Sequence, residues 1–93
     1  MGKEVLQVPL ENLHGDDPAQ RSNAAWELGM IGLAAAVPDL LTALYDSADN
    51  VRCNVVWALG NIGDGTAVHD LIGILPDSSA DVRQAIAYAL GKI

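Results

Sequence analysis

The sequence predicts an all-α fold, a right-handed α-solenoid of about two and a half stacked helical hairpins. Three observations support this prediction: a composition that favours helices, an internal repeat with a period of 31 residues, and apolar residues at helical spacing within each repeat. Because the repeats extend over nearly all of the 93 residues, we expect one domain.

The composition points to closely packed helices. Ala (14) and Leu (12) supply 26 of the 93 residues, whereas Phe is absent. These two residue types have the most favourable helix propensities, and a sheet protein would use more Thr, Tyr and Phe. The net charge of −7 disfavours binding to nucleic acids or to anionic membranes, both of which need a cationic surface.

The repeat appears as identical or similar residues 31 positions apart. Residues 17–47 and 48–78 share 14 of 31 aligned positions, and residues 48–62 and 79–93 share six of 15. The clearest series are Arg21, Arg52 and Arg83; Trp26, Trp57 and Tyr88; Leu28, Leu59 and Leu90; and Gly29, Gly60 and Gly91. Repeats of this length indicate a stacked array in which each unit completes the core of its neighbour.

Each complete unit has the pattern of two helices. In the unit 17–47, Asp17 is expected to cap the first helix, Pro18 to occupy its first position and Gly32 to end it. In the unit 48–78, Gly63 has the same role as Gly32, and Asp64 follows as a cap for the second helix. The apolar positions of that unit are Val51, Val55, Ala58, Leu59 and Ile62, then Val68, Leu71, Ile72 and Leu75.

The three equivalent glycines lie inside predicted helices, where Gly costs about 1 kcal/mol relative to Ala. Their common register indicates one cause, the close approach of a neighbouring helix. A nucleotide-binding loop is disfavoured, because neither GxGxxG nor GxxxxGK[ST] occurs in the sequence.

The phase of the repeat predicts a half unit at each end of the given chain. We expect residues 5–14 to form a half repeat, shortened or kinked by Pro9, followed by repeats at 17–47 and 48–78 and a half repeat at 79–93. The last helix would then leave apolar residues without a following helix to cover them. Self-association, as a possible homodimer through the terminal faces, is predicted through Val82, Ile86, Leu90 and Ile93.

The strings VRCNVVWALGNIGD (51–64) and DVRQAIAYALGKI (81–93), with AVPDLLTAL (36–44) and AVHDLIGIL (67–75), resemble HEAT-like repeats. They are most similar to the short subtype first associated with phycobilin lyases, the PBS lyase HEAT-like repeat. Gln20, Glu27 and Leu33 depart from that pattern, which indicates a less regular first unit. The resemblance implies first helices on a convex face, second helices on a concave face, and protein binding more often than catalysis. Some members attach or remove bilin chromophores, but the subtype does not by itself imply that activity.

Two residue series at the repeat spacing are candidate functional residues. Arg21, Arg52 and Arg83 lie beside acidic residues and are expected to form a structural ladder between units. Trp26, Trp57 and Tyr88, with Asn23 and Asn54 on the same flank, form either a partner-binding stripe or aromatic packing between adjacent helices.

The second helices carry equivalent acids, Asp39 and Asp70. These residues would lie next to each other on the concave side, where an acidic groove suits a basic or amphipathic partner segment. The alternative is that each is a solvated acid at a helix start, where the helix dipole favours it.

No catalytic motif, metal-binding motif or cofactor motif occurs. His14 and His69 are not at the spacing of metal ligands, and the single Cys53 is expected to be a small packing residue in a protein of the reducing cytoplasm. No targeting segment or membrane-spanning run is found. We therefore expect a non-enzymatic protein-binding module or scaffold. The alternatives are an accessory subunit of a bilin lyase, or another factor of chromophore-protein maturation, and a structural unit that self-assembles.

Overall fold

The computed structural model describes residues 2–77 and 79–93, and this part of the chain is helical, without strands. Three short 3₁₀ turns, η1 to η3, accompany the α-helices. The elements in chain order are α1 (Gly2–Leu13), α2 (Pro18–Ile31), η1 (Ala34–Ala36), α3 (Val37–Ala43), α4 (Asp49–Ile62), η2 (Gly65–Ala67), α5 (Val68–Ile74), η3 (Leu75–Asp77) and α6 (Ala80–Lys92).

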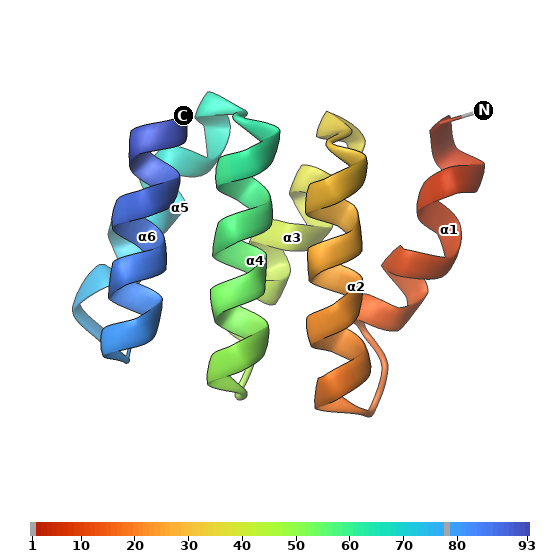
Figure 1. Ribbon diagram of the computed structural model, residues 1–93, viewed down its shortest axis with the longest axis horizontal. Helices are drawn as coiled ribbons and strands as arrows, with labels where there is room; N and C mark the ends of the chain where they lie inside the picture. The colour runs from red at the N-terminus through yellow and green to blue at the C-terminus, as the bar shows by residue number, and fades with distance from the viewer. Residues whose placement is uncertain (1, 78) are drawn as a thin grey trace.

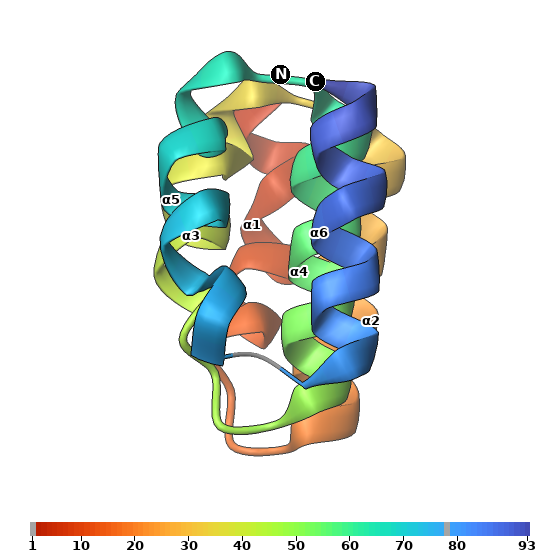
Figure 2. The same ribbon diagram turned by 90° about the vertical axis from the view of Figure 1, so that its left-hand side faces the viewer.

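The helices stack as antiparallel hairpins in two layers. Helices α2, α4 and α6 stand side by side in one row, and the N-terminus and C-terminus lie at opposite ends of the stack (Figure 1). Seen along the row, α3 and α5 lie on the other side of the molecule from α2, α4 and α6 (Figure 2). The predicted all-α solenoid of helical hairpins is confirmed.

The ends of the helices follow the local signals in the sequence. The carboxylate of Asp17 accepts a hydrogen bond from the backbone N–H of Ala19 at 3.0 Å, and Pro18 begins α2. Gly32 (φ 73°) and Gly63 (φ 77°) adopt the left-handed conformation that ends α2 and α4. Asp64 caps the 3₁₀ turn η2, which leads directly into α5, rather than α5 itself.

The core lies between the two layers and is made almost entirely of aliphatic side chains. Fully buried large residues come from every α-helix: Leu6, Leu13, Leu28, Leu40, Leu44, Val51, Val55, Val56, Leu59, Leu71, Val82 and Ile86. Each helix therefore contributes one apolar face to a continuous interior, as stacked repeats require.

The burial of α6 corrects the prediction of an uncovered apolar face. Val82 and Ile86 are 0% exposed, and Leu90 and Ile93 are partly buried against the core. The apolar face of α6 is turned toward α4 and α5, because this orientation removes it from water without a further helix. These four residues do not form an exposed patch for self-association.

Two of the three equivalent glycines allow close helix packing. A Cβ atom at Gly29 would lie 2.8 Å from Cα of Ala58, and one at Gly60 would lie 2.7 Å from Cα of Ala89. The predicted close approach is therefore confirmed for α2 against α4 and for α4 against α6. Gly91 differs, because a Cβ atom there would have no neighbour within 4 Å in the described part of the chain.

The predicted division into half and full repeats remains a prediction. Helix α1 lies in the segment expected to form the first half repeat and packs against α2, with Pro9 inside the helix. The boundary predicted at residue 78 falls outside the described residues.

Candidate functional site

Two residues of the arginine ladder, Arg21 and Arg52, join α2 and α4 to the loops before them. Nη1 of Arg21 donates to the carbonyl oxygen of Gly15 at 2.9 Å, and Nη1 of Arg52 donates to that of Asp46 at 2.6 Å, in each case six residues earlier in the chain. Nε of Arg21 also donates to the Asp46 carboxylate at 2.8 Å. Both arginines therefore bind Asp46, which joins the first unit to the second. Arg83 lies at the same register on α6.

Asp46 is held as a carboxylate. Burial alone raises the pKa of Asp46, but hydrogen bonds from the Arg21 guanidinium and from the backbone N–H of Ala48 outweigh it, so that its pKa lies below the ordinary value. The side chains of this pair are only 14% and 10% exposed. These contacts support a structural function for this part of the ladder.

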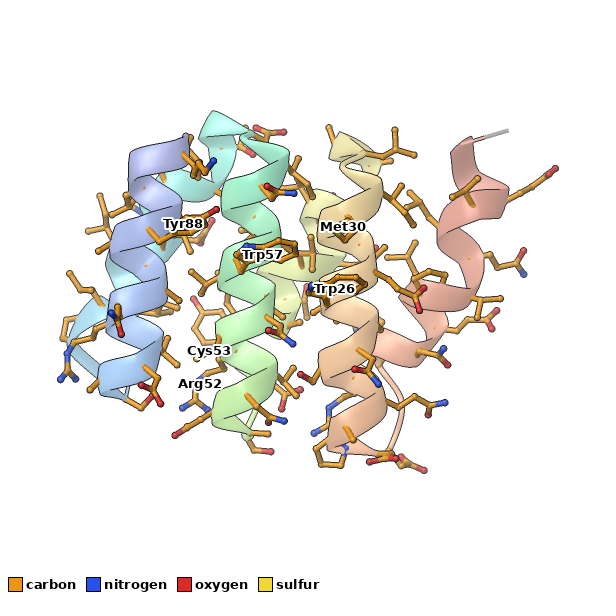
Figure 3. All side chains as sticks on the ribbon, in the orientation of Figure 1. Trp26, Met30, Arg52, Cys53, Trp57 and Tyr88 are labelled. Carbon is orange, nitrogen blue, oxygen red and sulfur yellow. The ribbon has the colours of Figure 1, made fainter. Side chains whose placement is uncertain are left out.

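The aromatic stripe, Trp26, Trp57 and Tyr88, lies in a row across α2, α4 and α6 (Figure 3). The rings of Trp26 and Trp57 are stacked, with centroids 6.3 Å apart and planes 9° apart. Trp26 is nevertheless 49% exposed and Tyr88 45% exposed, while Trp57 is half-buried. Aromatic packing between adjacent helices is therefore present for Trp26 and Trp57, whose rings also remain partly open to solvent. Partner binding by the stripe stays a prediction.

Cationic and acidic groups surround this stripe. Nζ of Lys92 lies 5.6 Å from the ring centroid of Tyr88. Asp81 lines a shallow hollow together with Trp57 and Tyr88, and Glu27, next to Trp26 in the chain, is exposed.

The two asparagines assigned to the same flank have different environments. Asn23 is exposed, whereas Nδ2 of Asn54 donates to the backbone oxygen of Ser22 at 3.0 Å and to its hydroxyl at 2.6 Å. Nδ2 of Asn61 likewise donates to the carbonyl oxygen of Gly29 at 2.9 Å. The side chain of Asn54 therefore links α4 to α2 by hydrogen bonds. The sequence analysis did not predict that Ser22 and Asn61 also take part in the contact between these two helices.

The acids of the second helices are half-buried. Asp39 accepts a hydrogen bond from Nε2 of His14 at 3.1 Å, which ties the start of α3 to the end of α1. Asp70 occupies the equivalent position on α5. The hydrogen bond to His14 was not predicted, since it joins residues that are 25 positions apart.

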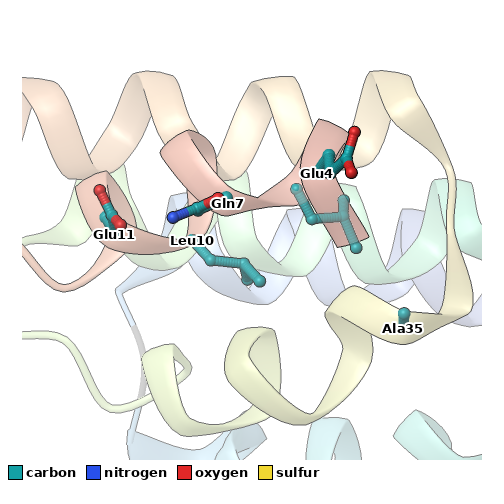
Figure 4. A pocket seen from close by; sticks show the side chains of 6 residues that line it. Glu4, Gln7, Leu10, Glu11 and Ala35 are labelled. Atoms are coloured by element: carbon teal, nitrogen blue, oxygen red, sulfur yellow. The ribbon is translucent and has the colours of Figure 1, made fainter. Parts of the chain in front are cut away.

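A hollow of about 480 Å³ lies beside α1, on the side of the second helices. Leu6, Leu10 and Ala35 supply apolar walls, and the acids Glu4 and Glu11 also line it. Figure 4 shows the side chain of Leu10 directed across the space toward α3. The sequence analysis did not identify this hollow.

The chemistry of the remaining polar groups is limited. Cys53 is half-buried, and burial, with smaller contributions from the Asp81 and Asp49 carboxylates, raises the pKa of its thiol above the ordinary value. Among the described residues, no cluster of three or more His, Cys, Asp or Glu side chains is arranged to hold a metal ion. None of the helices in the described segments combines the length and the apolarity needed to cross a membrane.

Stacked helical hairpins, a shared core and a ladder of equivalent contacts define a helical repeat protein. The family model for HEAT repeats matches residues 6–93, and the chain belongs to the HEAT-repeat family. HEAT repeats commonly mediate protein–protein interactions or scaffolding and are typically non-enzymatic. No match to this chain is found among the curated proteins.

Proposed function

We propose that this chain is a non-enzymatic protein-binding module that takes its partner on the aromatic stripe. The observation that carries the proposal is the stacked yet half-exposed Trp26–Trp57 pair, extended by Tyr88. Tryptophan and tyrosine dominate the binding energy of protein interfaces. Because the two indoles already hold each other in place, little conformational entropy is lost when a partner covers them.

The surroundings of the stripe indicate the chemistry of the partner. Glu27 and Asp81 place negative charge at its borders, in a chain with a net charge of −7. A segment with an apolar anchor and one or more Arg or Lys side chains would cover the rings and pair with these acids. We therefore favour a basic, partly apolar peptide segment of another protein.

The test uses peptides selected from a random library displayed on phage. A selected peptide should bind the wild-type chain and lose about tenfold or more of its affinity for Trp26→Ser. The matched control is Tyr45→Ser, which removes a 71% exposed aromatic ring outside the stripe and should leave the affinity unchanged. Equal affinity for wild type and Trp26→Ser, or a selection that yields no peptide, would contradict the proposal.

A second candidate surface for partner binding is the hollow beside α1. It lies on the side of the second helices, where the sequence predicts an acidic groove. Its apolar walls and the acids Glu4 and Glu11 suit a basic amphipathic segment. Each of the variants Glu4→Gln and Glu11→Gln should weaken binding of such a segment and make the binding less sensitive to salt. Asp70→Asn should weaken binding if the segment extends along α5. Unchanged binding by all three variants would exclude the second-helix face as the binding site.

The same hollow supports the bilin-lyase alternative, since its volume lies within the range of small-molecule sites. A bilin held there would change its visible absorption and fluorescence when mixed with the chain. Leu10→Asp would abolish that change. An unaltered bilin spectrum in the presence of excess wild-type chain would exclude the alternative.

A further inference from the structure

The aromatic stripe crosses two equivalent helix contacts, α2 with α4 and α4 with α6 (Figure 3). At the first contact the indoles of Trp26 and Trp57 are stacked on each other. At the second contact Trp57 and Tyr88 line a shallow hollow of about 480 Å³. The two contacts therefore differ, although the repeat places the same register positions at both.

One residue difference explains why the second contact is hollow. At the first contact, Nδ2 of Asn54 fills the space between the helices and donates to the backbone oxygen of Ser22 at 3.0 Å and to its hydroxyl at 2.6 Å. The register position of Asn54 is occupied on α6 by Ala85, which lines the hollow. Because alanine has only a methyl group, the space that Asn54 fills between α2 and α4 is left open between α4 and α6.

The polar walls of the hollow carry negative charge. Asp81 and Gln84, both exposed on α6, supply these walls. Among the described residues, Asp81 has no ion-pair partner. Its charge acts across the contact, because it contributes to raising the pKa of the Cys53 thiol on α4. The hollow therefore presents a free carboxylate beside an amide whose oxygen can accept a hydrogen bond.

The aromatic walls are suited to a cation. Figure 3 shows the ring of Tyr88 directed from α6 toward α4. The faces of such rings attract positive charge, and Nζ of Lys92 already lies 5.6 Å from the centroid of this ring. Lys92 follows Tyr88 along α6, whereas Asp81 and Gln84 precede it. The hollow is therefore a separate approach to a ring that binds a cation within the molecule.

A planar cation fits these walls best. The guanidinium of arginine stacks on aromatic rings and donates several directed hydrogen bonds to carboxylate and amide oxygens. The ammonium of lysine is compact and strongly hydrated, so that it uses an aromatic wall less well. An uncharged amide would leave the charge of Asp81 unpaired, and the net charge of −7 disfavours an acidic side chain in the hollow.

We infer that the hollow between α4 and α6 is a subsite for one arginine side chain of the binding partner. This inference rests on the proposed function, because the arginine belongs to the segment that covers the aromatic stripe. Its guanidinium would lie against Trp57 and Tyr88 and donate to the carboxylate of Asp81. The stacked Trp26–Trp57 pair would take the apolar anchor of the same segment, and the subsite would select among segments that carry such an anchor.

Peptides selected on the wild-type chain test the subsite. They should share an arginine at a fixed spacing from the apolar anchor. Replacement of this arginine by citrulline, which keeps the shape but removes the charge, should weaken binding about tenfold or more. Replacement by lysine should weaken binding about threefold, because the charge remains and the planar stacking is lost.

Ala85→Asn is the most specific variant of the chain, because it introduces the residue that fills the equivalent space between α2 and α4. It should weaken binding of the arginine peptide about tenfold. The melting temperature should not fall, because a hydrogen bond from the new amide to α4 offsets the lower helix propensity of Asn. The matched control is Ala87→Asn, the same substitution at an exposed position of α6 outside the hollow, which should leave the affinity unchanged.

Asp81→Asn tests the charge of the subsite without changing its size. This variant should weaken binding of the arginine peptide about fivefold and leave the affinity for the citrulline peptide unchanged. Glu11→Gln removes one negative charge outside the hollow and is the control for the net charge of the chain. Isothermal titration calorimetry measures these affinities.

The outcomes separate the subsite from the proposed function. Equal affinity for the arginine and citrulline peptides, or equal losses in Ala85→Asn and Ala87→Asn, would exclude the subsite. The proposed function would still stand in that case if Trp26→Ser weakened the peptide. Conversely, a peptide that needs its arginine and Asp81 but binds Trp26→Ser as tightly as wild type would support the subsite and contradict the tryptophan anchor. A selection that yields no peptide would overturn both.

Discussion

At the scale of single residues, two glycines of the same register have opposite surroundings. A methyl group at Gly60 would lie 2.7 Å from Cα of Ala89, whereas one at Gly91 would lie in open space. We expect Gly60→Ala to lower the free energy of unfolding by about 1–3 kcal/mol, because α6 must move away. Gly91→Ala should raise it by about 0.5–1 kcal/mol, because Ala restricts the unfolded chain and favours the helix.

Urea unfolding followed by circular dichroism measures both changes. Similar effects of the two substitutions would show that helix propensity alone decides them and that the contact of Gly60 with α6 is unimportant.

Asp46 predicts a specific acid sensitivity. Its pKa is below the ordinary value of about 4, so the folded state prefers the carboxylate and the stabilisation is fully present above that value. The stabilisation is lost as the pH falls through the lowered pKa. Asp46→Asn should cost about 1–2 kcal/mol at neutral pH, where charged hydrogen bonds are lost. The difference from wild type should shrink below pH about 4.

Unfolding curves at several pH values check this expectation, with Glu11→Gln as a control for an exposed acid. A difference between wild type and Asp46→Asn that stays constant from neutral pH to strongly acidic pH would show that the Arg21 ion pair does not determine the acid sensitivity.

The sequence predicted the residues with local functions better than those with distant partners. Asp17 and Gly32 are recognisable because a cap and a left-handed stop depend on neighbouring residues alone. The hydrogen bonds of Asn54 to Ser22 and of His14 to Asp39 depend on how helices from different units are placed. Asn54 therefore could be assigned to the correct flank but not to its actual partner.

At the scale of helices, α4 and α6 are attached to their predecessors differently. Asn54 and Asn61 each donate a side-chain hydrogen bond to α2. The equivalent residues of α6 are Ala85 and Lys92, and Ala85 has no side-chain donor. We expect α6 to open more readily than α4, so that its amide hydrogens exchange faster in hydrogen–deuterium exchange by mass spectrometry.

Equal protection of α4 and α6 would show that the stack opens only as a whole. Asn54→Ala provides the complementary test, because it should bring the protection of α4 closer to that of α6.

Helix α6 is the element whose orientation the sequence analysis predicted incorrectly. Its apolar residues were correctly identified as one face, but that face was expected to point out of the stack. Val82 and Ile86 instead point inward, and the outward residues are Ala87 and Gly91. Periodicity determines which residues share a face, whereas the direction of that face depends on the packing of the neighbouring helices.

At the scale of the whole molecule, the repeat period was sufficient to predict the architecture. A period of 31 residues with two apolar stripes per unit leaves few arrangements other than stacked hairpins. The period could not predict the hollow beside α1, because it depends on residues in which the units differ. Val8 on α1, in place of an acid, and Glu27 on α2, in place of Ala, are examples of such differences.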